Sequence, residues 1–414
     1  MAEPIYDLVT VGASVAGVAA AEEFRRRRPD ARILVVDADP SAPYDKPPLS
    51  KEYLLGGSES ASLRLGTDGF WSTVELRVGC SASAVAQGGL NIAGEHVSTR
   101  SCVVATGSSA RSLETVSGAS NATPLRTLAD ASRLRRLVVG AQSPVIVGAG
   151  FIGLEVASAL STLGVAAHVV ELRDRPLIDV LGSTVSDWLR AVHESRGVVF
   201  HRGKMMVAAR RNGAGEIVGV ELSDGTSLPC DLLLIGVGAV PNTELLGDVL
   251  SDPDGIACDE HLHTEVPGTF AAGDVARFLD LGRGVADRIE HWTNARLQGR
   301  HAGSNAARWI LGEDLEPFID VPYVWSDQCG LQLQIVGRPA LGRERLQVQG
   351  DSDSAGLFSE FMNDNGQVVG AVAVNAPRQL MRLRRELVAI ARRQAMQDVH
   401  EVRSTVADPT SHSP

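Results

Sequence analysis

Residues 5–37 read IYDLVTVGASVAGVAAAEEFRRRRPDARILVVD and carry most of the information on the architecture. A β-branched run leads into a glycine turn, an Ala-rich helical stretch follows, and a second β-branched run ends in Asp37. Residues 144–171, PVIVGAGFIGLEVASALSTLGVAAHVVE, repeat this order and end in Glu171. Each pattern is typical of a βαβ unit that binds a dinucleotide, so the sequence predicts two such units and two bound nucleotides.

Composition sets wide limits on what the chain can be. Its 414 residues predict several domains, and 44% hydrophobic with 21% charged residues is typical of a globular protein and excludes a wholly disordered chain. The net charge of −11 argues against nucleic acid as the main partner, because nucleic-acid binders are usually basic.

The second glycine turn is the more regular of the two. Gly148, Gly150 and Gly153 follow a strand and open a helix, which places a pyrophosphate at the helix N-terminus. Glu171 ends the next strand, where its carboxylate accepts from ribose hydroxyls and disfavours a 2′-phosphate. NADH is therefore expected in preference to NADPH, although Arg173 nearby weakens that expectation.

The first turn departs from the glycine pattern at one position. It comprises Gly12, Ser14, Ala16 and Gly17, with Asp37 as the expected ribose acceptor. Ser14 stands where the second glycine belongs. We interpret it as a tolerated variant, since serine is small and its hydroxyl can donate to a phosphate.

Further motifs resemble a known family. They are YDKPPLSK at 44–51, ATG at 105–107, GVGAVPN at 236–242, GD at 273–274, EHWTNA at 290–295 and VWSDQ at 324–328. Their order and spacing resemble FAD-dependent NADH:ferredoxin reductases of the putidaredoxin reductase and biphenyl-dioxygenase ferredoxin reductase type, within the glutathione-reductase-like superfamily. Lys46 replaces the arginine common in that family, and Ala110 replaces a proline before Arg111.

The resemblance implies an α/β fold with two Rossmann-like dinucleotide-binding domains of the glutathione-reductase type and a C-terminal α+β domain. We expect an FAD-binding domain at 1–110 and 240–315, an NADH-binding domain at 111–239, a C-terminal α+β domain at 316–400 and a disordered tail at 401–414. Residues 111–136 are polar and are expected to form a linker.

The resemblance also implies the activity and its residues. NADH would reduce non-covalent FAD, which would pass single electrons to a 2Fe-2S ferredoxin that serves a cytochrome P450 or a ring-hydroxylating dioxygenase. Lys51, Glu155 and Trp292 are expected to position and tune the reaction, with Lys51 and Glu155 as an ion pair. The expected cofactor-binding residues are Gly12, Ser14, Ala16, Gly17, Asp37, Lys46, Pro48, Lys51, Thr106, Gly107, Arg111, Gly148, Gly150, Ile152, Gly153, Glu155, Glu171, Gly238, Gly273, Asp274, His291, Trp292 and Trp325.

The five cysteines bear on the alternatives. No C-x-x-C motif occurs and no cysteine lies among residues 1–79, so thiol chemistry of the disulfide-reductase kind is poorly supported. An NADH oxidase remains an alternative, as does an NADH-sensing flavoprotein resembling apoptosis-inducing factor. The odd, scattered cysteines predict reduced thiols and a cytoplasmic protein. The longest apolar stretch, 137–160, contains Glu155 and is interrupted by a glycine turn, so no membrane association is expected. We expect no metal site.

The segment 377–393, PRQLMRLRRELVAIARR, is the most basic part of the chain. As a helix it would pack Leu380, Leu383, Leu387 and Ile390 inward. Arg378, Arg382, Arg385, Arg392 and Arg393 would then project outward and are a candidate docking patch for an acidic ferredoxin.

Overall fold

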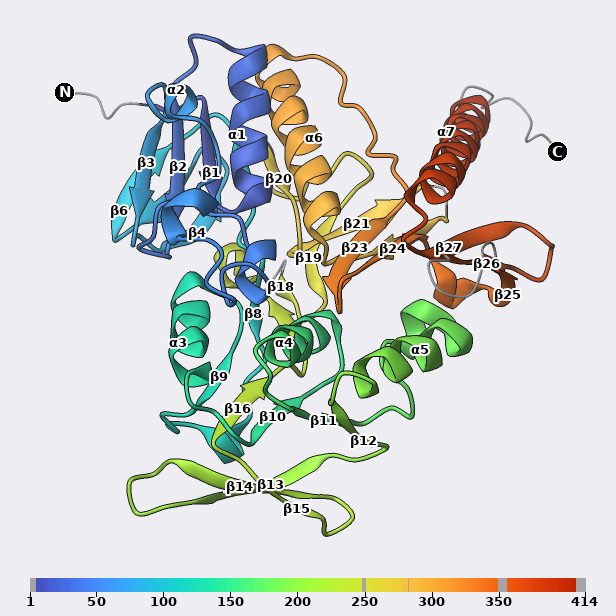
Figure 1. Ribbon diagram of the computed structural model, residues 1–414. Coiled ribbons are helices and arrows are strands. Elements are labelled where there is room, and N and C mark those ends of the chain that lie inside the picture. The colour runs from blue at the N-terminus through green and yellow to red at the C-terminus, as the bar shows by residue number, and fades with distance from the viewer. Residues whose placement is uncertain (1–4, 248–250, 282, 349–355, 407–414) are drawn as a thin grey trace, which may run out of the picture.

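The computed structural model describes residues 5–247, 251–281, 283–348 and 356–406. Figure 1 shows a first parallel sheet with α1 and α6 beside it, a second parallel sheet below it, and a C-terminal sheet to the side with α7 on its outer face. No helix among the described residues has both the length and the hydrophobicity that a bilayer span requires.

The first sheet is entirely parallel and runs in the order β3–β2–β1–β7–β20. Its strands are β1 (Leu8–Val11), β2 (Ile33–Asp37), β3 (Glu75–Val78), β7 (Cys102–Val104) and β20 (Thr269–Ala271). The inner strands β1 and β7 are buried along their whole length. Burial on both faces explains their uninterrupted apolar sequence.

The second sheet has the same arrangement, with the order β12–β11–β10–β16–β9 and parallel pairing throughout. Its strands are β9 (Ala122–Pro124), β10 (Pro144–Val147), β11 (His168–Glu171), β12 (Val199–Arg202) and β16 (Leu232–Ile235). A glycine turn follows the central strand in both sheets, β1 in the first and β10 in the second. The two predicted βαβ units are therefore confirmed as structural repeats.

The prediction that residues 111–136 form a linker is wrong. This segment supplies β9 at the sheet edge and most of α3 (Leu128–Val138). Helix α3 begins with a capping box, in which Thr127 accepts from the Asp130 backbone N–H and the Asp130 carboxylate accepts from that of Thr127. The box satisfies free N–H groups at the helix start, and composition alone does not reveal it.

Helices α1 (Val15–Arg27) and α4 (Phe151–Thr162) begin at the two glycine turns. The long helix α6 (Trp292–Leu311) packs along α1, as Figure 1 shows. Apart from α7, described below with the C-terminal sheet, the other described helices are α2 (Asp68–Trp71) and α5 (Ile178–Glu194). The short 3-10 turns are η1 (Pro47–Ser50), η2 (Ser60–Leu63), η3 (Glu114–Val116), η4 (Glu244–Leu246) and η5 (Pro339–Leu341).

Smaller sheets accompany the two large parallel sheets. Their strands are β4 (Ala82–Ala86), β5 (Gly89–Ile92), β6 (Glu95–Ser98), β13 (Met206–Arg211), β14 (Ile217–Leu222), β15 (Ser227–Pro229), β18 (Ser251–Asp252), β19 (Gly255–Cys258), β21 (Ala276–Asp280) and β22 (Val285–Asp287). Between the two large sheets, β8 (Ser108–Ala110) pairs antiparallel with β17 (Ala239–Pro241). The chain thus crosses and returns side by side, while the domain boundaries themselves stay a prediction.

The C-terminal sheet is antiparallel in the order β23–β24–β27–β26–β25. Its strands are β23 (Tyr323–Gln328), β24 (Leu331–Gly337), β25 (Arg343–Val348), β26 (Leu357–Met362) and β27 (Val368–Val374). Helix α7 (Pro377–Val406) packs on β24 and β27, which confirms the α/β fold with a C-terminal sheet domain.

Two expectations for α7 need correction. Leu380 is fully buried, but Ile390 is 42% exposed, because Val388 and Ala391 take the inward positions one turn later. Residues 401–406, expected in a disordered tail, continue the helix, and residues 407–414 lie outside the described part of the chain.

Two glycines on α6 allow its close approach to α1. A Cβ atom added to Gly299 would lie 2.1 Å from the Ala16 carbonyl oxygen, and one added to Gly303 would lie 2.2 Å from that of Ala20. Both obstacles are backbone atoms, so a side chain at either position forces the helices apart.

We expect Gly299→Ala to lower the free energy of unfolding. Alanine improves helix propensity by about 1 kcal/mol, but overpacking against backbone costs about 1–3 kcal/mol and dominates. Chemical denaturation measures the difference. Gly213→Ala, at a loop glycine with no atom within 4 Å of the added Cβ, is the matched control and should be neutral. Unchanged stability of Gly299→Ala would show that the helix contact is not tight.

Candidate functional site

The first glycine of each turn has the same strained geometry. Gly12 has φ +107° and Gly148 has φ +103°. A Cβ at Gly12 would meet the Ala105 carbonyl oxygen at 2.1 Å, and one at Gly148 would meet that of Gly236 at 2.2 Å. Only glycine fits these positions, because an L side chain is disfavoured by φ and blocked by backbone.

The second position of the turn has no such requirement. Ser14 and Gly150 are both the N-cap residues of their helices, with φ of −85° and −76°. Any residue adopts this conformation, which explains why serine replaces glycine in the first turn. The third glycines are again obligatory, since a Cβ at Gly17 or Gly153 would lie 1.8 or 2.1 Å from the first glycine's carbonyl oxygen.

The two strand-end acids are held in equivalent ways. Asp37 Oδ2 accepts from the Ala13 backbone N–H at 2.5 Å, and Glu171 Oε2 accepts from that of Ala149 at 2.7 Å. Each carboxylate is thereby fixed beside its glycine turn, at the carboxyl edge of a parallel sheet where nucleotides bind.

A cavity of about 1100 Å³ lies between the two turns and reaches the C-terminal strands β23 and β24. The predicted site residues that line it are Gly12, Ser14, Ala16, Asp37, Lys46, Lys51, Thr106, Gly107, Gly150, Ile152, Gly153, Glu155, Gly238, Gly273, Asp274, His291, Trp292 and Trp325. The predicted site residues outside its lining are Gly17, Pro48, Arg111, Gly148 and Glu171. Segments from all parts of the sequence thus meet at one cavity large enough for a flavin and a nicotinamide.

Lys51 and Glu155 form the ion pair that the sequence predicts. Lys51 Nζ lies 2.7 Å from Glu155 Oε2, and both side chains are largely buried. The ammonium also lies 5.3 Å from the centre of the Trp325 ring, a distance that allows a cation–π contact. Two further donors escaped the sequence analysis: Ser50 Oγ and Ser326 Oγ each donate to the carboxylate at 2.5 Å.

Trp292 and His291 lie at the start of α6, on the cavity wall. The Trp292 indole N–H donates to Asp45 Oδ1 at 2.5 Å, and the Arg296 guanidinium lies 5.6 Å from the ring centre. Asp45 was not anticipated; burial raises the pKa of its carboxyl group. Burial lowers the pKa of His291 to about 4, so its imidazole, packed edge-on against Phe151, is neutral at physiological pH.

Positive charge gathers around Asp274. Arg126 Nη2 lies 2.7 Å from Asp274 Oδ2, and Ser108 Oγ donates to the same oxygen at 3.1 Å. Arg126 comes from the segment expected to be a linker, so no sequence signal marked it. Burial lowers the pKa of Lys46 to about 8, and the Arg126 charge adds to this lowering despite nearby carboxylates.

This charge arrangement suits a bound phosphate. An anion beside Lys46 would stabilise its ammonium form. The glycine turns lead into helix N-termini with backbone N–H groups, and each parallel sheet has one strand-end acid beside its turn, Asp37 in the first and Glu171 in the second. The residues present therefore fit two dinucleotides.

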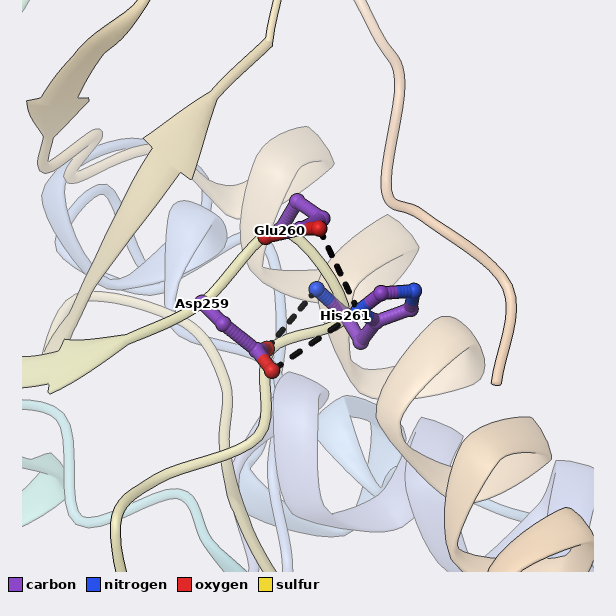
Figure 2. A group of neighbouring side chains, drawn as sticks. All are labelled: Asp259, Glu260 and His261. Carbon is purple, nitrogen blue, oxygen red and sulfur yellow. Dashed lines mark hydrogen bonds and ion pairs between the residues drawn. The ribbon is translucent and has the colours of Figure 1, made fainter. Parts of the chain in front are cut away.

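One cluster of potential metal ligands exists among the described residues. Figure 2 shows Asp259, Glu260 and His261, whose ligand atoms lie within 4.8 Å of one another. The Asp259 carboxylate already accepts the backbone N–H groups of His261 and His263, and the Glu260 carbonyl accepts that of Phe318. These contacts give the cluster a structural role in a turn.

FAD affinity should depend on pH through Lys46. The ammonium of the free protein titrates near pH 8 and must be charged to hold a phosphate, so affinity is greatest below pH 8. Above it, affinity should fall by up to about tenfold per pH unit. Fluorescence titration of the apoprotein between pH 7 and 9 measures this. Lys46→Arg, charged throughout, should abolish the dependence, and a flat wild-type profile would separate Lys46 from the phosphate.

Comparison with known proteins agrees with this geometry. Residues 6–299 match the family described as pyridine nucleotide-disulphide oxidoreductase, and residues 323–407 match the family described as reductase C-terminal. The chain is 34% identical to the ferredoxin–NAD(+) reductase component of the p-cumate 2,3-dioxygenase system of Pseudomonas putida, over 99% of this chain and 98% of that protein. It is 34% identical to the anthranilate 1,2-dioxygenase system ferredoxin–NAD(+) reductase component of Burkholderia cepacia, over 97% of each chain.

Solved structures of ferredoxin reductases are similar to this chain over most of its length. Putidaredoxin reductase, in its covalent complex with putidaredoxin, superposes with a TM-score of 0.85 at 29% identity, covering 93% of each chain. The ferredoxin reductase for the CYP199A2 system of Rhodopseudomonas palustris gives 0.83 at 31% identity, covering 89% of this chain and 91% of that one. With its two nucleotide-type sheets, its shared cavity and these matches, the chain belongs to the pyridine nucleotide-disulphide oxidoreductase family.

Proposed function

We propose that this oxidoreductase is an FAD-dependent NADH:ferredoxin reductase, an electron-transport flavoprotein. It would pass electrons from NADH through FAD to a 2Fe-2S ferredoxin that serves a cytochrome P450 or a ring-hydroxylating dioxygenase. The observation that carries the proposal is the opening of both glycine turns toward one cavity that contains the Lys51–Glu155 pair. Relatives named as ferredoxin reductase components span nearly the whole chain.

The site residues divide between the two nucleotides. We assign to FAD the first turn, Asp37 and the cavity residues Lys46, Pro48, Lys51, Thr106, Gly107, Arg111, Gly238, Gly273, Asp274, His291, Trp292 and Trp325. We assign to NADH the second turn with Gly148, Gly150, Ile152, Gly153, Glu155 and Glu171. Bound FAD would accept a hydride from NADH and release two electrons singly.

The protein's own groups would bind, orient and shield. Glu155 and the Trp325 ring hold the Lys51 ammonium at the cavity wall, and Asp45 fixes the plane of Trp292. Because His291 is neutral at physiological pH, it adds no positive charge to the cavity. The overall balance is one NADH and two oxidised ferredoxins giving NAD⁺, two reduced ferredoxins and one proton.

The disulfide-reductase alternative finds no support in the cysteines. All five are free, and Cys80 is the one that lines the cavity, without a second cysteine beside it in the described lining. Free thiols suit a reducing compartment, and on this ground we infer a cytoplasmic location.

Anaerobic turnover with a panel of 2Fe-2S ferredoxins tests the function. We expect two ferredoxins to be reduced per NADH oxidised, and the loss of ferredoxin absorbance measures this reduction. Stoichiometric peroxide formation in air with no ferredoxin reduction would instead identify an NADH oxidase. Slow reduction with a long-lived charge-transfer band would identify an NADH sensor.

NADH should be preferred over NADPH by at least about tenfold in kcat/KM, because like charges in contact cost several kcal/mol. Arg173, which would favour a 2′-phosphate, has its Nη2 3.1 Å from Asp179 Oδ2. Steady-state kinetics with both cofactors measures the ratio. Glu171→Ala combined with Asp179→Asn should shift it toward NADPH, whereas Asp179→Asn alone should shift it less. A wild-type ratio near one contradicts the assignment of Glu171.

Ferredoxin docking should involve α7. Arg378, Arg382, Arg385, Arg392 and Arg393 are exposed, whereas Arg384 turns inward to Asp320. Reversing Arg382 and Arg385 to glutamate should raise KM for ferredoxin several-fold at low salt and leave reduction of ferricyanide unchanged. The same reversal at exposed Arg210 and Arg211 on β13 is the control for net charge. An equal effect of both pairs would place docking elsewhere.

A further inference from the structure

A chain of buried polar groups extends from Glu155 away from the cavity. Ser326 Oγ lies 2.5 Å from Glu155 Oε1, Gln328 Nε2 lies 3.0 Å from Ser326 Oγ, and His193 Nε2 lies 2.8 Å from Gln328 Oε1. Ser326 and His193 are fully buried and Gln328 is 2% exposed. Buried polar groups of this kind are costly unless each is hydrogen-bonded, so the chain is a built feature.

The donors and acceptors in the chain all run in one direction. A carboxylate only accepts, so Ser326 must donate to Glu155 and must in turn accept from the Gln328 amide nitrogen. The Gln328 amide oxygen then needs a donor, which His193 supplies from Nε2. Burial lowers the pKa of His193, so it is neutral, and its Nδ1 faces the Cys329 thiol at 3.6 Å.

The chain connects separate parts of the molecule. His193 lies on α5, in the part of the chain that contains the second parallel sheet. Ser326 and Gln328 lie on β23 of the C-terminal sheet. It ends at Cys329, which is 2% exposed, and does not reach solvent. A closed end rules out a proton exit and leaves a positioning role.

The Ser326 hydroxyl has one proton, which it donates to Glu155, while the Gln328 amide presents its nitrogen to the Ser326 oxygen. As long as His193 satisfies the Gln328 amide oxygen, that proton is available to Glu155. Without the imidazole, the buried amide oxygen would be unsatisfied, at a cost that favours rotation of the Gln328 amide by half a turn, so that its oxygen faces Ser326 and accepts the hydroxyl proton. Glu155 would then lose the donor to its Oε1, and this freed oxygen would attract the Lys51 ammonium, which already lies 2.7 Å from Oε2.

We propose that His193 is a positioning residue for the reaction, which acts through Gln328 and Ser326 on Glu155 and thereby sets the position of the Lys51 ammonium at the cavity wall. The proposal rests on the function assigned above, and it adds the second sheet's half and the C-terminal sheet to the control of flavin reduction. His193 itself lies outside the cavity lining.

The test compares variants of the FAD-loaded enzyme. His193→Leu removes the donor, and His193→Gln retains a side-chain N–H that can replace Nε2. We expect His193→Leu to slow flavin reduction by NADH about tenfold in anaerobic stopped-flow, with the NADH dissociation constant changed less than about twofold. His193→Gln should recover most of the rate. His168→Leu, which removes an imidazole from the neighbouring strand β11, should behave as wild type.

Spectroelectrochemistry supplies a readout independent of turnover. Withdrawal of the Lys51 charge from the cavity should make the flavin midpoint potential more negative in His193→Leu and in Ser326→Ala, but not in His168→Leu. If His193→Leu does not fold, Ser326→Ala and His193→Gln decide the matter alone. A wild-type rate of flavin reduction together with a wild-type midpoint potential in Ser326→Ala or His193→Leu would overturn the positioning role of His193. If NADH does not reduce the flavin of the wild-type enzyme at all, the proposed function is overturned instead.

Discussion

The carboxylate of Glu155 is the constraint around which the site is built. It lies on α4 with apolar neighbours, and an unpaired charge in that position would cost several kcal/mol. Three donors compensate it: Ser50 and Lys51 from η1 and the residue that follows it, and Ser326 from β23. Because these donors come from the first sheet's half and the C-terminal sheet, satisfying one charge fixes the relative position of three parts of the chain at the cavity.

Around this charge the fold contains the same arrangement of glycine turn, helix and strand-end acid twice. Each parallel sheet has a first glycine that only glycine can occupy, a helix that starts at the turn, and a strand-end acid held by a backbone N–H. The two turns face the same cavity, which lets two nucleotides meet over a short distance.

Local features of the site follow from the sequence, and contacts between distant segments do not. The glycine turns and the strand-end acids could be predicted because their signals are short-range. The Lys51–Glu155 pair follows from the family resemblance. Ser326, 171 residues from Glu155, and Arg126, 148 residues from Asp274, were missed because no local pattern marks a partner brought in by folding.

A double-mutant cycle on Lys51 and Glu155 tests the central claim most directly. The rate of flavin reduction by NADH would be measured by anaerobic stopped-flow in wild type, Lys51→Met, Glu155→Gln and the double variant, each saturated with FAD. If the pair acts as one unit, the double variant should be no slower than the slower single variant, so that the two effects are strongly non-additive. Rate losses that simply multiply would show that Lys51 and Glu155 act independently and would contradict this account.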